Sequence, residues 1–308
     1  MKKLQNLLPG EDLFGLLGRS YVLGNYCNFS DLRKDLCLSH YRHSPGRFLS
    51  RDFATIAKIL GKEVSQLNDE HTCFNMLKST LSDSQLANHT EHSKSVIFHK
   101  NKEVVSQPWR WCAECAADDI SLYGVTYYHR DHQVPGVKCC HKHQVPLIRG
   151  CGHCHFEVTS IKVMPVPPVD GICPRCGHSF DGYYVPTPTM QYVEQICIDL
   201  ANGRLDITHA QLSQRVCNYI GIAQEEIEQG KVGKQVRSFY RQVMEFYSMD
   251  ELQGYFYQVF ERKSGVYCPA LQTARIYDRH ATSFAHHPLV TALIWHFLNE
   301  QESLPLVA

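Results

Sequence analysis

Two groups of metal-ligating side chains lie in the middle of the chain, and their ligands come in pairs separated by two residues. We name them the first donor set, Cys112, Cys115, Cys140 and His143, and the second donor set, Cys151, Cys154, Cys173 and Cys176. Two ligands at this spacing share one tight turn, and tetrahedral Zn²⁺ is held by two such turns that face each other. The sequence therefore predicts two structural zinc ions.

Spacing alone leaves the pairing of these turns open. In cross-braced modules the pairs interleave, so that the first pair shares an ion with the third. The neighbouring Cys139 and His141 also offer substitute ligands for the first donor set. We favour Cys140 and His143, because the two residues between them match the spacing of a metal-binding turn.

Four protein ligands per ion favour a structural role over catalysis. A catalytic zinc keeps one position open for water or substrate, whereas both donor sets are full. The chain also lacks a Walker phosphate loop, a G-x-S-x-G elbow and an H-E-x-x-H helix. We predict that the protein is not an enzyme. The alternative is a metal-dependent nuclease site that folding assembles from three distant acidic residues.

The other cysteines are expected to pack as small apolar residues in the core. Disulfide frameworks are typical of small secreted proteins, whereas this chain has 308 residues and no signal sequence or membrane-spanning run, which predicts a cytoplasmic location. A reduced thiol in apolar surroundings packs like a small hydrophobic group. The seven are Cys27, Cys37, Cys73, Cys139, Cys197, Cys217 and Cys268.

The charge is balanced, with 31 basic and 31 acidic residues, so any contact with nucleic acid needs a local basic patch. One group of cations has helical spacing near residue 236, and another surrounds the first donor set. A solvated helix face is the alternative to phosphate binding. The candidate nucleic-acid contacts are Lys231, Lys234, Arg237, Arg241, Arg110, Arg130, Lys138 and Lys142.

Helices are expected on both sides of the metal region. Before it, apolar residues recur at helical spacing over 13–21, 30–38 and 53–60, and Gly24 and Gly61 are expected to end the first and third helices. A short helix after Gly61 completes a helix-turn-helix-like pair, which is common in DNA-binding proteins and also in other small helical domains.

After the metal region the chain is predicted to be helical again. Thr208 and Gln211 form a capping box that opens one of these helices. The metal region itself is dense in glycine and proline, so its regular structure must be short. The predicted fold is therefore mainly α with a small-β or irregular zinc-ribbon-type centre. Its predicted domains are an N-terminal helical domain, a double zinc-binding domain and a C-terminal helical domain, at 1–105, 106–184 and 185–308.

The amino-acid sequence around the first donor set resembles that of the TniQ/TnsD family of transposon target-site selection proteins. The family pattern is R-W/Y-C-x-x-C, H-Q-x-P-G-V and C-x-x-H-x-x-P-L. The segments that carry the resemblance are Trp111-Cys-Ala-Glu-Cys115, Tyr123-Gly124, Tyr128-His-Arg130, His132-Gln-Val-Pro-Gly136 and Cys140-His-Lys-His143-Gln-Val-Pro-Leu147, with His71-Thr-Cys-Phe74 upstream and Arg279-His280 and Phe284 downstream.

This resemblance implies a non-enzymatic adaptor. Family members recognise a target and recruit an AAA+ transposition regulator (TnsC-like), which brings the transposase. Some bind attachment-site DNA directly, and others dock, often as dimers, on an RNA-guided CRISPR effector complex. The family also implies a bacterial, nucleoid-associated protein when on DNA. The neutral charge and the short C-terminal part favour an adaptor that docks on a protein complex. The sequence at 71–74 favours the branch that binds DNA directly.

Three functions stay open, in this order: the target-selection adaptor, a stand-alone sequence-specific DNA-binding protein, and a metal-dependent enzyme acting on DNA. Direct DNA binding predicts a steep salt dependence for one duplex sequence. The adaptor predicts weak binding to DNA alone and tight association with the regulator or a guide complex.

Overall fold

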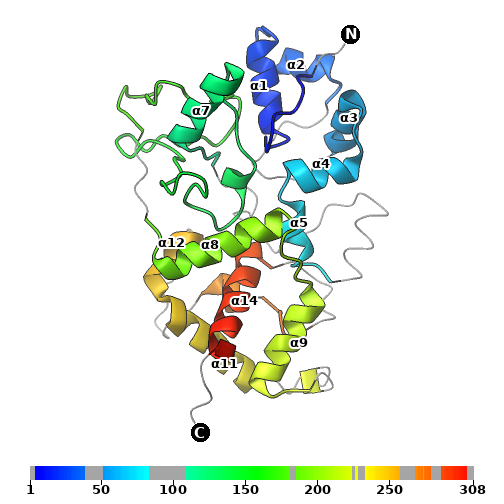
Figure 1. Cartoon of the computed structure of the whole chain (residues 1–308), viewed down its shortest axis with the longest axis vertical. Coiled ribbons are helices and arrows are strands. Elements are labelled where there is room, and N and C mark those ends of the chain that lie inside the picture. Colours follow the sequence, from blue (N-terminus) through cyan, green and yellow to red (C-terminus); the bar gives the residue numbers. More distant parts are fainter. Residues whose placement is uncertain are drawn as a thin grey trace. The chain divides into compact units, whose positions relative to one another are not determined.

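The described residues of the computed structural model form two compact units, each built from two separate stretches of the chain (Figure 1). Unit 1 comes from 1–75 and 102–203, and unit 2 from 76–101 and 204–308. The division into three domains remains a prediction. The described residues are 4–38, 51–82, 108–180, 185–223, 226–227, 233–256, 268–272, 274–278 and 286–303.

The N-terminal half of unit 1 is helical, as predicted. Asp12 opens the first helix, because its Oδ1 accepts hydrogen bonds from the backbone amides of Phe14 and Gly15. Asn28 caps the second helix by accepting from the amide of Asp31. The helices of this half are α1 Gly15–Leu23, α2 Phe29–Asp35, α3 Arg51–Leu60, α4 Val64–His71 and α5 Phe74–Lys78, where the chain passes to unit 2.

The predicted helix-turn-helix pair is present as α3 and α4, which pack against each other. Gly61 follows α3 with a φ of 64°, a left-handed conformation that glycine adopts without strain. Asp69 and Glu70 are exposed on α4. Carboxylates at these positions repel phosphate, so the exposed surface of α4 is poorly suited to DNA.

The rest of unit 1 is mostly irregular, and isolated β-bridges are its extended pairings among the described residues. Its regular elements are α7 Ala113–Tyr123, the short 3₁₀ helix η2 Asp131–Gln133 and α8 Pro188–Ala201. The eleven-residue α7 was not predicted, although Gly124 ends it in the left-handed conformation that such a stop requires. The predicted fold class, mainly α with a small irregular metal-binding centre, is confirmed.

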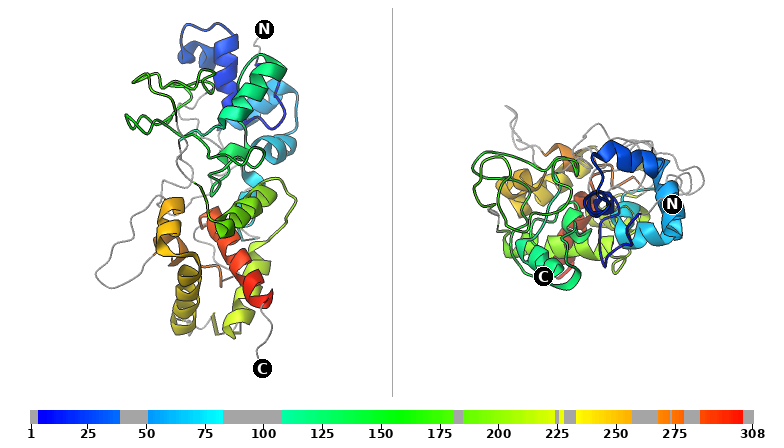
Figure 2. Two further views of the ribbon diagram at one scale, coloured as in Figure 1. Left: turned by 60° about the vertical axis from the view of Figure 1, so that its left-hand side comes forward. Right: turned by 90° about the horizontal axis from the view of Figure 1, so that it is seen from above.

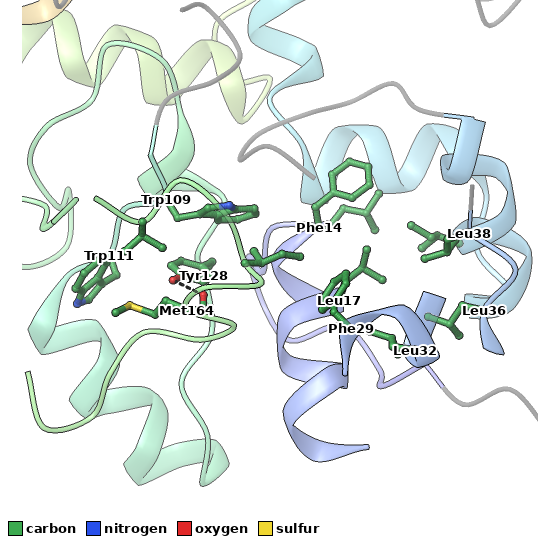
Figure 3. Close-up of a cluster of buried hydrophobic side chains, with 14 of the residues drawn as sticks. Phe14, Leu17, Phe29, Leu32, Leu36, Leu38, Trp109, Trp111, Tyr128 and Met164 are labelled. Atoms are coloured by element: carbon green, nitrogen blue, oxygen red, sulfur yellow. Dashed lines mark hydrogen bonds between the residues drawn. The ribbon is translucent and has the colours of Figure 1, made fainter. Parts of the chain in front are cut away.

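One hydrophobic core joins the N-terminal helices to the metal region (Figure 3). Phe14 and Leu17 of α1 belong to the same buried cluster as Trp109, Trp111 and Tyr128. The cluster also contains cysteines of the second donor set, Cys151 and Cys173. The metal region and the helices of residues 10–75 therefore share one core.

The proline-rich loop inside the second donor set is fixed to this core by its backbone. Its carbonyl oxygens accept hydrogen bonds from the hydroxyl groups of Tyr128 and Thr126, at Met164 and Pro167 respectively. Gly18 of α1 approaches the loop so closely that an added Cβ would lie 2.0 Å from the carbonyl oxygen of Pro165. A glycine is therefore required where α1 meets the loop.

A buried ion pair holds the entrance to α1. The Arg19 guanidinium donates to both oxygens of Glu11 at 2.7 Å, and both side chains are almost fully buried. His71 at the end of α4 bonds the Glu11 carbonyl oxygen at 2.8 Å. Burial raises the pKa of Glu11, whereas the Arg19 charge opposes this shift. These contacts tie α1 and α4 together.

Unit 2 is a small helical assembly in which α9, α11 and α14 pack against one another (Figure 2). The predicted capping box is present, because the side chains of Thr208 and Gln211 each accept a hydrogen bond from the backbone amide of the other residue. Tyr247 and His296 join α11 to α14 through a 2.7 Å hydrogen bond. The helices are α9 His209–Ile220, α11 Gly233–Tyr247, α12 Met249–Phe256, α13 Pro269–Gln272 and α14 Pro288–Ser303.

Two of the seven cysteines predicted to be buried are exposed. They are Cys27 and Cys37, and each follows a short helix of unit 1. Cys139 is half-buried, and the others of the seven are buried. Within the described ranges, no helix is long and apolar enough to cross a membrane.

Replacing Gly18 with alanine should destabilise unit 1. The added methyl group would collide with the Pro165 backbone, and overpacking of this kind costs about 1–3 kcal/mol. Urea unfolding measures the change. Val22→Ala, at an exposed position of the same helix, is the control and should change the free energy of unfolding little. Equal stability of Gly18→Ala and wild type would contradict the close approach.

Acid should destabilise unit 2, because it buries neutral histidines. Burial lowers the pKa of His286, whose Nε2 lies 2.8 Å from the Thr291 hydroxyl, well below the ordinary value of about 6.5. Burial also lowers the pKa of His296. Below pH ~6.5 the unfolded chain therefore binds more protons than the folded chain. The contribution of these histidines to the free energy of unfolding should be fully present above this pH. Below it, the free energy of unfolding should fall by up to about 1.4 kcal/mol per pH unit for each histidine.

Thermal unfolding between pH 7.5 and pH 5 checks this dependence. His286→Gln should reduce the loss of stability at low pH, because about one proton fewer is taken up on unfolding. His153→Gln, at an exposed position of unit 1, should leave the pH dependence of stability unchanged. An identical pH profile for His286→Gln and wild type would show that the buried ring does not contribute.

Candidate metal centres

The first ligand pair of the first donor set lies at the N-terminus of α7. Cys112 is the N-cap residue, and its Sγ accepts a hydrogen bond from the backbone amide of Cys115 at 3.5 Å. The backbone amides at a helix N-terminus favour negative charge, so this position stabilises thiolates. Both sulfur atoms are buried.

The second pair lies on a tight turn. The amide of Cys140 donates to the Val145 carbonyl oxygen, and the amide of Gln144 donates back to Cys140, both at 2.8 Å. Gln144, directly after the ligand His143, has a φ of 57°. This left-handed residue closes the turn and lets the chain continue into the bridge between Cys139 and Pro146.

The four donor atoms of the first donor set form a compact group. His143 Nδ1 lies 3.5, 3.4 and 3.7 Å from the sulfur atoms of Cys112, Cys115 and Cys140, and the last two sulfur atoms are 3.7 Å apart. A tetrahedral ion with metal–sulfur bonds of about 2.3 Å has edges of about 3.6–3.8 Å. The donor atoms therefore match the coordination shell of a single tetrahedral ion.

Two further contacts orient these ligands. His143 places its other nitrogen, Nε2, 3.2 Å from a carboxylate oxygen of Asp118. His132 is almost fully buried, and its Nε2 lies 3.7 Å from the Cys115 sulfur. With a metal ion bound, the Cys115 thiolate would be an acceptor, and a proton on His132 Nε2 would serve as its donor. Such outer contacts fix ligand orientation and strengthen metal binding.

A buried pair supports His132. His129 Nε2 lies 3.0 Å from a carboxylate oxygen of Asp119 on α7, and the His129 ring packs against His132 with centroids 4.9 Å apart. The Tyr127 ring also stacks on the His129 ring, with centroids 4.3 Å apart. The His129 side chain thus has a packing role beside the first donor set.

The second donor set is built from two turns of the same kind. The amide of Cys151 donates to the Phe156 carbonyl oxygen at 2.7 Å, and that of Cys173 donates to the His178 carbonyl oxygen at 2.8 Å. The residue after the second cysteine of each turn, His155 or Gly177, has a positive φ, as Gln144 has. Three of the four ligand pairs therefore share one backbone conformation.

The two donor sets are grouped in sequence order, so the interleaved alternative does not occur. Within the second donor set, the Cys151 and Cys176 sulfur atoms are 3.6 Å apart, and those of Cys154 and Cys173 are 3.7 Å apart. The substitutes Cys139 and His141 belong to neither group; His141 lies 3.6 Å from Asp131 instead. Two complete four-ligand groups are present, each able to hold one metal ion.

Helix α8 is attached to the first donor set by a residue that the sequence did not indicate. Glu194 is buried, and its Oε2 accepts hydrogen bonds from the backbone amides of Lys138 and Cys139 at 3.1 and 3.0 Å. The carboxylate therefore caps the turn that carries Cys140. A glutamate in an ordinary helix gives no sequence signal for such a role.

Two of the predicted nucleic-acid contacts are buried, and this corrects their interpretation. Arg110 donates to the carbonyl oxygens of Val134 and Val137. Arg130 donates to the carbonyl oxygens of Asp69 and Ala201. Both residues are less than 5% exposed, and they hold backbone segments of unit 1 together. A cation beside a metal site has the same sequence pattern whether it binds phosphate or the protein's own backbone.

The other basic candidates divide by exposure. Burial lowers the pKa of Lys138 to about 8, and Lys142 is exposed. Lys234, Arg237 and Arg241 are exposed along one side of α11, whose other side is buried through Val236, Tyr240, Val243 and Tyr247. The predicted amphipathic helix is present, and Lys231 lies outside the described residues.

Loss of one metal ligand should unfold unit 1 as a whole. A structural metal ion contributes on the order of 10 kcal/mol to folding, and the metal region shares its core with α1 and α2. Cys140→Ser should lose the ion of the first donor set, and with it the helical signal of these helices and the fold that holds the second ion. Metal analysis and circular dichroism measure both. Cys139→Ser, one residue earlier and outside the donor set, should keep both ions; equal metal content in the two variants would contradict the assignment.

Comparison with protein families matches residues 5–147 to TniQ. The matched region contains the N-terminal helices and the whole first donor set, and it ends before the second donor set. A comparison with curated proteins finds no match for the chain.

Proposed function

We propose that the chain, which belongs to the TniQ family through residues 5–147, is a non-enzymatic adaptor for target-site selection. In this proposal it links a recognised target to an AAA+ transposition regulator, and through the regulator to the transposase. The TniQ match is the observation that carries the proposal.

We propose Zn²⁺ as the ion of both donor sets. Three thiolates with one imidazole, and four thiolates, are typical structural zinc ligand sets. Edges of 3.4–3.7 Å suit zinc bond lengths. With four protein ligands, neither ion would have an open position for water, which supports a structural role and argues against metal-assisted hydrolysis at these sites.

The target contact has two proposed sources. An RNA-guided CRISPR effector complex would be bound mainly through protein surfaces, which agrees with a net charge of zero. Attachment-site DNA would need cations, and the exposed Lys234, Arg237 and Arg241 of α11 are the proposed phosphate contacts, with Lys142 and Lys138 as further candidates. A homodimer is also proposed.

A stand-alone DNA-binding protein is the second candidate, because the helix-turn-helix pair of α3 and α4 is present. Its weakness is the acidic surface of α4, where Asp69 and Glu70 would face the phosphates of a major groove. We therefore rank it below the adaptor.

Binding measurements separate these functions. The adaptor should bind the AAA+ regulator or the guide complex of its own transposon tightly, and bind duplex DNA alone only weakly. Biolayer interferometry with each partner, at several salt concentrations, measures this. Reversing Lys234, Arg237 and Arg241 to glutamate should weaken the DNA-dependent part at least tenfold, whereas Gln235→Glu on the same helix should not.

Three results would contradict the proposal. Tight binding of one duplex sequence by the chain alone, with a steep salt dependence, would assign the direct DNA-binding function. Failure to bind both the regulator and the guide complex would remove the adaptor. DNA cleavage that one carboxylate substitution abolishes in a folded protein would make the protein an enzyme.

A further inference from the structure

Two exposed aromatic side chains lie beside the exposed cations of α11. Tyr219 of α9 and Phe246 of α11 are 37% and 38% exposed. The Tyr219 hydroxyl donates a 2.8 Å hydrogen bond to the side-chain oxygen of Gln242. Gln242 directly follows Arg241, and Phe246 lies one helical turn farther along. Aromatic rings and a guanidinium group therefore share one patch of the surface of unit 2.

Both rings pack on their neighbours by edge-to-face contacts. Phe297 of α14 contacts both, with ring centroids 5.7 Å from Tyr219 and 5.6 Å from Phe246, and with interplanar angles of 75° and 81°. Their other ring contacts with described residues have the same geometry. In the described part of the chain, no ring is stacked flat on Tyr219 or Phe246. A flat group from a ligand can therefore stack on their exposed surface.

Helix α11 carries the charge that a phosphate backbone requires. Lys234, Arg237 and Arg241 are exposed on one side of the helix, and Glu245 is exposed one turn after Arg241. Three cations and one carboxylate leave a local excess of two positive charges, on a chain whose net charge is zero. Phosphates are attracted to such a local excess, and the attraction weakens as the salt concentration rises.

The combination of cations and exposed rings selects against a duplex. Paired bases stack on one another inside a double helix and present only their edges in the grooves. Unpaired bases expose their flat faces, which stack on aromatic side chains while the phosphates contact cations. A duplex would use the cations of α11 and leave the two rings without a partner, whereas a single strand uses both.

We propose that this face of unit 2 binds single-stranded nucleic acid, with bases stacked on the two rings and phosphates against the cations. We name it the single-strand face, formed by Tyr219, Phe246, Lys234, Arg237 and Arg241. Such binding deepens the proposed function, on which it rests, because it names what the recognised target presents to the adaptor. An RNA-guided complex opens its target duplex and offers a displaced DNA strand and a guide RNA, which share unpaired bases and phosphates.

Fluorescence anisotropy with the full-length protein tests the single-strand face. The probes are a labelled DNA strand of mixed sequence, the RNA strand of the same sequence and the DNA duplex, all at one salt concentration. The single strands should bind about tenfold more tightly than the duplex. A preference for DNA or for RNA assigns the contact to the displaced strand or to the guide, and supports the face in either case.

Leucine variants separate stacking from charge. Tyr219→Leu and Phe246→Leu keep an apolar side chain against Phe297 but lose the flat ring. Each should weaken single-strand binding about fivefold or more and leave duplex binding unchanged. Tyr192→Leu, at a 56% exposed tyrosine of unit 1, is the matched control and should bind single strands like wild type. Thermal unfolding checks that the leucine variants are folded.

Two results would overturn the single-strand face. One is duplex binding as tight as single-strand binding, and the other is wild-type affinity for single strands in folded Tyr219→Leu and Phe246→Leu. Binding of the AAA+ regulator and the guide complex tests the proposed function separately. A wild-type protein that binds both partners but no single strand refutes the face alone, and one that binds single strands but neither partner refutes the adaptor alone.

Discussion

Residues 108–180 have little regular hydrogen bonding to hold them, and this constraint governs unit 1. Among the described residues of this stretch, regular structure is limited to α7 and η2, and the extended segments meet in isolated bridges. A chain of this kind needs cross-links, and metal ions held by the two donor sets would supply them at three turns and one helix N-terminus. The two turns of the second donor set place Cys151 and Cys173 in the core that begins at α1, so ligation and packing depend on each other there.

The buried cations of unit 1 reflect the same need. Arg110 satisfies the carbonyl oxygens of Val134 and Val137 in the irregular segment. Arg130 satisfies carbonyl oxygens at the C-terminal ends of α4 and α8, at Asp69 and Ala201. Glu194 does the same for two amides of the turn that carries Cys140. Charged side chains thus supply hydrogen bonds that regular structure does not supply here, and the buried arginines near the metal centres have a structural role.

The candidate contact surface of unit 2 is of another kind. The two donor sets and the buried arginines belong to the interior structure of unit 1, whereas exposed cations lie along α11. The proposed adaptor needs a support of this kind, because a binding surface on an irregular chain keeps its shape only if the chain is cross-linked. In that proposal the metal ions act on the fold that carries the binding surface.

Local signals in the sequence determined the ligand spacing, the capping box at Thr208, the stop at Gly61 and the amphipathic face of α11, because each depends on residues within one or two turns of chain. The tertiary structure alone decided the pairing of the ligand turns, the shared core, the closeness of Gly18 to Pro165 and the roles of Arg110, Arg130 and Glu194. These features depend on atoms that are distant in sequence and become neighbours when the irregular segment closes on α1. A cation or carboxylate has the same sequence pattern on the surface and in the interior, and burial separates the two.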